Sequence, residues 1–265
     1  MNRRRVIAVV LLAAVVFSGS TWLAGRVQRE DPAPFPFDSV RVAVDPSYPP
    51  FASYTDAGEL VGIDIDLARA LAERLGLPVR IEPMGIDALF DALATDRANL
   101  VISAVRVEPW RMGDVRYTRT YYNAGLILVS RADDQLTGMT ALPGRTLALE
   151  YGSDADADAR RWLRRVQPFE THPYEAPGHA LDAVRLGVSD AALVDATSAY
   201  LYLRDHPDWT PALHHVTDEG FVIAAQRDQP AAHKAVDEAL ASLLEDGSVE
   251  AVLRRWLLPP QVDAP

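Results

Sequence analysis

Apolar and polar positions alternate along the chain in two different periods. Period-two runs of β-branched residues predict strands, and apolar residues spaced three or four apart predict helices. In the first half we predict strands at 40–44, 79–83 and 98–105, and helices at 64–75 and 86–95. The first helix should begin at Asp64 or Asp66 as its N-cap and stop at Gly76. The order strand, helix, strand, helix, strand indicates an α/β lobe with parallel strands.

The same pattern restarts in the second half. We predict strands at 125–130, 145–150, 190–195 and 220–225, and helices that run through Trp162 to Val166, at 179–187 and at 231–257, the last broken at Gly247. Two strand-helix runs of about lobe size therefore follow one another, and no short repeat is present.

The N-terminus has the features of an export signal. Arg3 to Arg5 precede an uncharged apolar run from Val6 to about Gly25, and small residues allow cleavage after Ser20. The run is also about long enough to span a bilayer, which takes ~20 residues. Residues 1–25 are thus a signal peptide, which we favour, or a retained anchor. In both cases the rest of the chain lies outside the cytoplasm, in the periplasm or on the outer face of the cytoplasmic membrane, after a Pro-rich linker at 26–37.

Composition excludes several classes of function. The net charge of -11 argues against a nucleic-acid partner, which needs a basic face. The chain has no cysteine, so disulfides, thiolate metal sites, a Cys nucleophile and a lipid-modified Cys are excluded. Lys234 is the only lysine, which makes arginine the default cation and lowers the weight of any single arginine.

Metal binding is not supported either. Aspartate recurs at every second residue from Asp154, but a calcium loop starting there needs glycine and glutamate where the chain has Ala159 and Arg165. The histidines show no metal-ligand spacing. We therefore expect no metal and no cofactor, and no local nucleophile–base motif indicates a catalytic residue.

Five segments together resemble one protein family. They are "DPSYPPF" (45–51), "GIDIDLARALAERL" (62–75), "RYTRTYYNAGLILV" (116–129), "DAALVDATSAYLYL" (190–203) and "LLEDGSVEAVLRRWL" (243–257). In this order they resemble family 3 of the bacterial extracellular solute-binding proteins, the amino-acid receptors of ABC importers. The resemblance covers about residues 38 to 257.

The resemblance implies an α/β, two-lobed periplasmic-binding-protein fold of type II. Each lobe would be a mainly parallel sheet flanked by helices, and two crossover hinge strands would join the lobes and let them close on a ligand. Lobe 1 would comprise 38–122 plus 222–257, lobe 2 would comprise 126–218, and 258–265 would be a tail. The crossovers would lie near 123–126 and 219–222.

The local sequence pattern and the family resemblance both point to candidate ligand-binding residues. Arg111 follows Pro109, so it fits the first turn of a helix with free backbone N–H groups, which suits a carboxylate. Asp195 ends a buried strand, where parallel sheets present ligand sites. The resemblance makes Arg111 the grip on the ligand α-carboxylate and Asp195 the partner of its α-ammonium. The alternatives are a solvated surface arginine and a helix N-cap.

Three more candidates surround these two. The resemblance makes Tyr48 the aromatic that stacks on the ligand side chain, Asp45 a reader of a polar or cationic ligand tip, and Ile86 part of the apolar wall. A loop aromatic packed on lobe 1, a turn-capping aspartate and a core helix residue are the respective structural alternatives.

Three positions, Arg106, Ser153 and Asp154, depart from the family pattern. The strand keeps Ser103 but continues with Ala104 and places Arg106 where a small hydroxyl residue is common; the second lobe has Ser153 followed by Asp154. Ser153 can cap its helix and donate to a carboxylate, whereas ionised Asp154 cannot donate. Arg106 and Asp154 would either pair across the cleft or, through Arg106, recognise a second acidic group. A solvent-facing Arg106 is the third alternative.

We therefore expect a non-enzymatic binding protein, a monomer, that captures an amino acid or a related polar small molecule and delivers it to the membrane permease of an ABC transporter. The alternatives are an enzyme on the same scaffold, resembling a cyclohexadienyl dehydratase, and a membrane-tethered ligand sensor that works with a partner.

Overall fold

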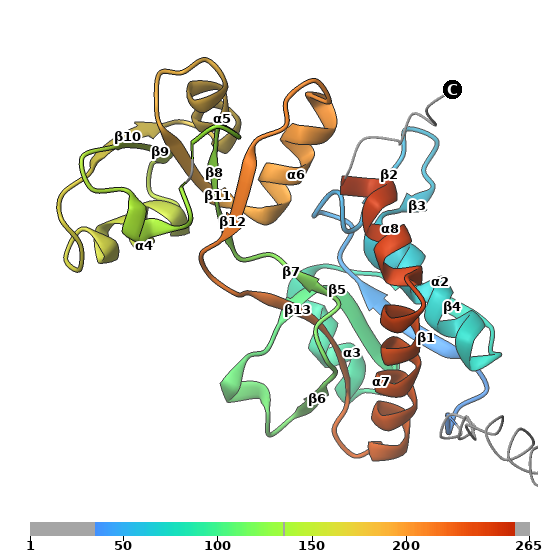
Figure 1. Ribbon diagram of the computed structural model, residues 1–265. Coiled ribbons are helices and arrows are strands. Elements are labelled where there is room, and N and C mark those ends of the chain that lie inside the picture. Colours follow the sequence, from blue (N-terminus) through green and yellow to red (C-terminus); the bar gives the residue numbers. More distant parts are fainter. Residues whose placement is uncertain (1–34, 135, 258–265) are drawn as a thin grey trace, which may run out of the picture. The chain divides into compact units, whose positions relative to one another are not determined.

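The computed structural model describes residues 35–134 and 136–257 (Figure 1). The predicted signal or anchor at 1–25, most of the linker at 26–37 and the tail at 258–265 lie outside the described residues. Among the helices that are described, none has the length and apolarity needed to cross a membrane.

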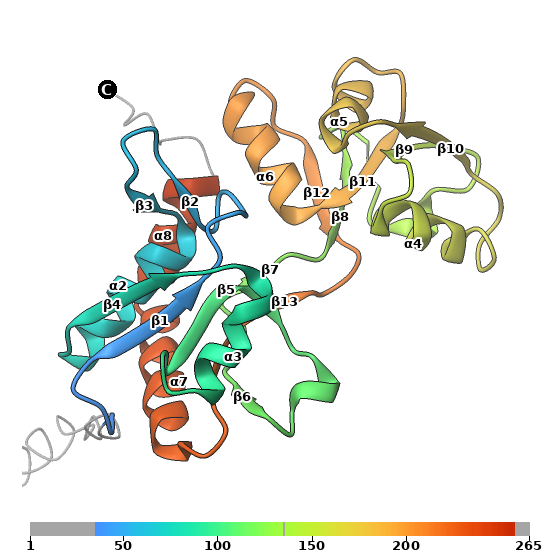
Figure 2. The same ribbon diagram turned by 180° about the vertical axis from the view of Figure 1, so that it is seen from behind.

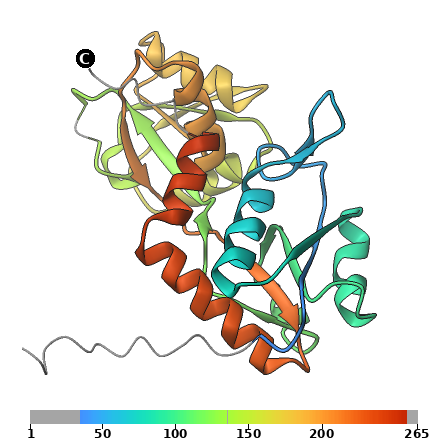
Figure 3. The ribbon, with the colours of Figure 1, turned by 90° about the vertical axis from the view of Figure 1, so that its right-hand side faces the viewer.

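The first sheet has six strands and carries the core of lobe 1. Its order is β4 (Val79–Pro83), β1 (Val40–Val44), β5 (Leu100–Arg106), β13 (Gly220–Gln226) and β6 (Val115–Tyr117), with β7 (Tyr122–Asn123) also on β13. One face packs against α2 (Ile63–Leu75), α7 (Pro230–Glu245) and α8 (Ser248–Leu257), which lie side by side (Figure 3). The other face packs against α3 (Leu89–Ala94) (Figure 2). Both faces are covered, which explains why β5 reads as one continuous apolar run.

The second sheet has five strands and carries the core of lobe 2. Its order is β10 (Glu170–Tyr174), β9 (Thr146–Glu150), β11 (Ala191–Asp195), β8 (Leu126–Ser130) and β12 (Ala212–His215). One face packs on α4 (Asp154–Trp162), and the other packs on α5 (Pro177–Arg185) and α6 (Ala196–Asp205). A short hairpin, β2 (Ser53–Tyr54) with β3 (Leu60–Val61), stands apart from both sheets.

Both sheets are mixed rather than mainly parallel, and the crossovers explain why. In each sheet three neighbouring strands are parallel, whereas β13 and β8 run against them. The start of β13 is in register with the end of β5, with Phe221 opposite Arg106, and Leu126 at the start of β8 lies opposite Asp195. Each crossover thus reaches its sheet at the carboxyl ends of the parallel strands. The strand that follows the crossover therefore runs antiparallel to them.

The two crossovers, 123–125 from the first sheet to the second and 216–219 on the return, are joined to each other by hydrogen bonds. Asn123 Oδ1 accepts hydrogen bonds from the backbone N–H of Gly125 at 3.0 Å and of Glu219 at 2.9 Å. Thr217 Oγ1 accepts from the backbone N–H of Leu126 at 2.8 Å. A Cβ on Gly125 would lie 1.9 Å from the carbonyl oxygen of Thr217, so only glycine allows the backbones to approach this closely.

Asp64 is not the helix cap that its position suggests. The helix α2 begins at Ile63, and its N-cap is Gly62, which makes no side-chain cap bond. Asp64 is buried instead; its carboxylate accepts hydrogen bonds from Tyr121 Oη at 2.7 Å and from the backbone N–H of Ala104 at 2.8 Å. It therefore joins α2, the end of β5 and the segment that leads to the first crossover.

Ala104 carries backbone strain where it meets Asp64. Its φ is 47°, in the left-handed region, which costs a non-glycine residue roughly 1–2 kcal/mol. We expect Ala104→Gly to stabilise the protein by about 1 kcal/mol, measured by urea unfolding, because glycine adopts this conformation freely. Ala70→Gly, in the middle of α2, should instead destabilise it by about 1 kcal/mol. A loss of stability in both glycine variants would contradict the inference that the backbone of Ala104 is strained.

Candidate functional site

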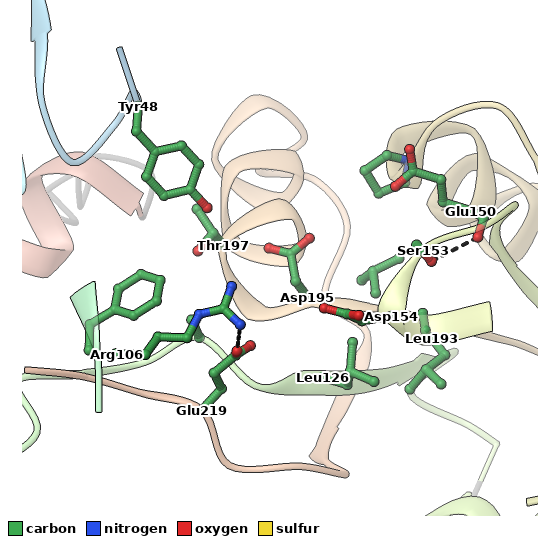
Figure 4. A pocket seen from close by; sticks show the side chains of 15 residues that line it. Tyr48, Arg106, Leu126, Glu150, Ser153, Asp154, Leu193, Asp195, Thr197 and Glu219 are labelled. Carbon is green, nitrogen blue, oxygen red and sulfur yellow. Dashed lines mark hydrogen bonds and ion pairs between the residues drawn. The ribbon is translucent and has the colours of Figure 1, made fainter. Parts of the chain in front are cut away.

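A cavity of about 210 Å³ lies where both crossovers meet the strand ends (Figure 4). From lobe 1 and the crossovers it is lined by Tyr48, Arg106, Ala124, Glu219 and Phe221. From lobe 2 it is lined by the ends of β9 and β11, by the first turn of α4 and by neighbouring residues. A ligand in this cavity would touch both lobes and the segments that join them.

Five of the nine predicted residues line the cavity. They are Tyr48, Arg106, Ser153, Asp154 and Asp195. Asp195 ends β11 and also caps α6, because its Oδ1 accepts a hydrogen bond from the backbone N–H of Ser198 at 2.9 Å. Both proposed roles of Asp195 are therefore compatible, since one carboxylate oxygen suffices for the cap. Ser153 likewise caps α4, through its bond from the N–H of Asp156, and its hydroxyl donates to the carbonyl of Glu150.

The other four predicted residues lie outside the lining of this cavity. Ser103 Oγ accepts a hydrogen bond from the backbone N–H of Asp45 at 2.9 Å, so these two hold the loop that carries Tyr48. Asp45 also accepts from the N–H of Ser47, which is the turn-capping alternative. Ile86 is 62% exposed at the start of a short 3₁₀ helix and belongs to no core cluster of the described residues.

Arg111 lies in a three-residue 3₁₀ turn, Pro109–Arg111, and not in the first turn of an α-helix. Its own backbone N–H is already used, because it donates to the carbonyl of Glu108 at 2.9 Å. Its guanidinium donates to the Glu108 carboxylate and lies 4.3 Å from the centroid of the Phe90 ring. Arg111 therefore adds no free backbone N–H of its own, whereas Glu108 engages only the Nε–H of its guanidinium.

Arg106 pairs with a residue that none of its three alternatives named. Its guanidinium forms an ion pair with Glu219, on the second crossover, and not with Asp154 (Figure 4). The register of β5 and β13 explains the pair, because Arg106 lies opposite Phe221 and Glu219 comes two residues earlier. The pair ties the end of β5 to the crossover at the wall of the cavity.

Three polar lining residues were not predicted from the sequence. Glu150 ends β9, Thr197 lies in the first turn of α6, and Glu219 lies in the crossover. Glu150 could have been predicted from the sequence, because it is an acidic residue at the carboxyl end of a buried parallel strand, where ligand sites lie. The Thr197 hydroxyl shares a hydrogen bond with Tyr122 Oη at 3.2 Å.

An aromatic group supports the cavity from lobe 1. Tyr48 is stacked on Phe51, with ring centroids 5.4 Å apart, and Phe51 packs on Tyr122 and Phe221. Burial and the nearby Asp195 carboxylate raise the pKa of Tyr48, while Arg106 opposes this shift. Tyr48 is therefore neutral at pH 7, and it offers a ring face and a hydroxyl to a ligand.

No metal site accompanies the cavity in the part of the chain that the structure describes. Among those residues, no group of three or more His, Cys, Asp or Glu side chains is placed to hold a metal ion. The acids of α4 that follow Asp154 have arginine partners: Asp156 pairs with Arg160, and Asp158 pairs with Arg161.

Comparisons with known proteins agree with the fold. The family model described as bacterial extracellular solute-binding proteins, family 3, matches residues 40–259. ABC transporter arginine-binding protein 1 of Escherichia coli (strain K12) is 26% identical over 225 residues, 83% of this chain and 90% of that protein. The L-cystine-binding protein TcyJ of the same organism is 26% identical over 223 residues, 81% of each chain.

A solved structure shows the same fold. The unliganded open form of the L-cystine solute receptor of Neisseria gonorrhoeae matches with a TM-score of 0.72 at 21% identity, over 83% of this chain and 92% of that chain. The two named sequence relatives are binding proteins.

Proposed function

Because the chain belongs to family 3 of the bacterial extracellular solute-binding proteins, we propose that it captures an amino acid or a related polar small molecule and delivers it to the permease of an ABC transporter. The relatives named for arginine and cystine binding support an amino-acid ligand. We place the protein outside the cytoplasm as a monomer without catalytic activity, exported by its N-terminal segment. The observation that carries the proposal is the cavity at the crossovers, which both lobes line.

The geometry suits capture by closure. Asp195 keeps one carboxylate oxygen beyond its cap bond and is our candidate for the ligand α-ammonium. Tyr48 offers a ring face to the ligand side chain. A ligand held by residues of both lobes stabilises the conformation in which the lobes approach each other, since only there are all contacts made together.

We keep Arg111 as the proposed grip on the ligand α-carboxylate. Glu108 engages only the Nε–H of its guanidinium, so the Nη groups can still donate to a ligand carboxylate. We expect Arg111→Ala to abolish the ligand-induced rise in melting temperature. The measurement is differential scanning fluorimetry with a panel of amino acids, dicarboxylates and polyamines, in which at least one compound should stabilise the unmodified protein.

The matched control is Arg69→Ala, which removes an arginine that is 55% exposed on α2 and paired with Asp66. It should keep the full ligand response. Retention of that response by Arg111→Ala would remove Arg111 from the site but leave the proposed function intact. The function itself would be contradicted if no compound in the panel stabilised the protein, or if the protein converted prephenate or arogenate to product.

A further inference from the structure

We propose that the cavity selects a ligand with two positively charged groups, of which Asp195 holds one and Glu150 holds the other, while Asp154 adds a further negative charge to the same wall. This inference rests on the proposed function, because it concerns the charge of the ligand in the same cavity. Glu150 and Asp154 are then the residues that determine specificity.

The charge of the cavity wall is the first observation. Four carboxylates, those of Glu150, Asp154, Asp195 and Glu219, line the cavity together with one guanidinium, that of Arg106. Three carboxylates therefore have no balancing cation within the lining. A neutral zwitterionic ligand would leave that excess unchanged, whereas each additional cationic group reduces it by one charge.

The single guanidinium is the second observation, because it is already engaged. Arg106 forms its ion pair with Glu219, at the side of the cavity that the crossover forms. A ligand with a second acidic group would have to break that pair and expose the Glu219 carboxylate beside three others. Like charges in a partly desolvated site repel strongly, so the wall disfavours dicarboxylates.

The remaining three carboxylates lie on one wall, which lobe 2 forms. The strands β9 and β11 are parallel neighbours, with Leu149 opposite Leu193, so Glu150 and Asp195 sit at adjacent strand ends. Asp154 opens α4 after the short turn that follows Glu150, and its carboxylate points into the cavity toward Asp195 (Figure 4).

These three carboxylates also lack ion pairs, in contrast to their neighbours. No arginine, lysine or histidine of the described chain lies within 4.0 Å of any of them, although Asp156 and Asp158 on the same helix each have an arginine. Carboxylates that are drawn together without a cation are destabilising unless a ligand supplies the charge. A cation bound at Glu150 supplies it at one end of the lobe 2 wall, a second cation supplies it at Asp195, and the Asp154 carboxylate adds to the negative potential of the wall.

The decisive experiment compares ligands that differ in one charge. L-Arginine and L-citrulline have nearly the same shape, but only arginine has a cationic tip. By isothermal titration calorimetry at fixed ionic strength we expect L-arginine to bind at least about 30-fold more tightly than L-citrulline, the loss typical of a charged group left without its partner. L-Glutamate and succinate should bind more weakly than L-citrulline.

Two variants and a control assign the preference to residues. Glu150→Gln and Asp154→Asn should each reduce the ratio of arginine to citrulline affinity by about tenfold, mainly by weakening arginine binding. Asp133→Asn removes the same charge from lobe 2, but its side chain is 84% exposed and outside the cavity lining, so the ratio should stay unchanged. This control separates a local contact from the effect of net charge.

L-Ornithine and its decarboxylated form, putrescine, distinguish the two classes of ligand that have two cationic groups, basic amino acids and diamines. Tighter binding of ornithine identifies a basic amino acid, and tighter or equal binding of putrescine identifies a diamine; both support the two-cation inference. Equal or stronger binding of L-citrulline would overturn the inference while leaving amino-acid capture intact. Unchanged ratios in both variants would remove Glu150 and Asp154 from the specificity. If no compound bound at all, the proposed function would fail instead.

Discussion

Replacing Gly125 by alanine is expected to destabilise the folded protein by about 3 kcal/mol or more, because the added methyl group has no room. Its Cβ would lie 1.9 Å from the backbone carbonyl oxygen of Thr217, on the other crossover. A backbone oxygen cannot rotate away as a side chain can. The crossovers would have to separate, at the expense of the bonds from the N–H of Glu219 to Asn123 and from the N–H of Leu126 to Thr217.

Thermal unfolding followed by circular dichroism measures this effect, and a fall in melting temperature of roughly 6–12 °C is expected for a chain of this size. Gly85→Ala is the matched control, because nothing lies within 4 Å of its added Cβ and its φ is -68°. The melting temperature of Gly220→Ala should fall between the two, since the atoms nearest to its added Cβ belong to the side chain of Thr120 and not to the backbone. Equal melting temperatures for the Gly125 and Gly85 variants would contradict the close approach of the crossovers.

The second large effect concerns pH and the buried carboxyl group of Asp64. Burial raises its pKa from the ordinary value of 3.8 to about 7, although the bonds from Tyr121 and Ala104 oppose the shift. The folded state therefore binds this proton more tightly than the unfolded state. The associated stability is fully present below pH 3.8 and is lost as the pH rises through about 7.

We therefore compare unfolding free energies of the unmodified protein and Asp64→Asn between pH 4 and pH 8. The Asn side chain can still accept from the Ala104 N–H and can donate to Tyr121 Oη, but it does not titrate. Relative to this variant, the unmodified protein should lose on the order of 4 kcal/mol across that window. The control is Asp87→Asn, which replaces an exposed aspartate of lobe 1. Its unfolding free energy should change with pH in parallel with that of the unmodified protein. Parallel profiles for the Asp64 variant would contradict the raised pKa.

The sequence predicted the buried elements and the edge strand β4, but it missed the edge strands β6, β10 and β12. The runs at β1, β5, β9 and β11 are apolar because helices cover both faces of the sheets. The strand β10 has the sequence ETHPY; it lies at the edge of its sheet, where Pro173 is tolerated and one strand alone defines the pairing. Short polar strands of this kind form because a neighbouring strand pairs with them, and their own sequence has no alternation that would predict them.

The same distinction between local and long-range features holds for the candidate site. Strand ends and helix starts are readable, and the two lobe 2 elements that begin or end at Ser153, Asp154 and Asp195 do line the cavity. Side-chain partners are not readable in the same way. Arg106 meets Glu219, 113 positions later, only because β13 pairs with β5. Arg111 offered a local signal, since Glu108 three residues earlier is within reach of a short helical turn.

The path of the chain also sets an order of assembly. Every strand of the second sheet lies between Leu126 and His215, whereas β13, which joins β5 to β6 in the first sheet, begins only at Gly220. As the polypeptide emerges from its N-terminus, the residues of lobe 2 are complete before lobe 1 can close its sheet. Until β13 and α7 arrive, β5 has an open edge and an uncovered apolar face, which is a template for aggregation. The late central strand therefore makes lobe 1 the part that depends most on protection during synthesis and export.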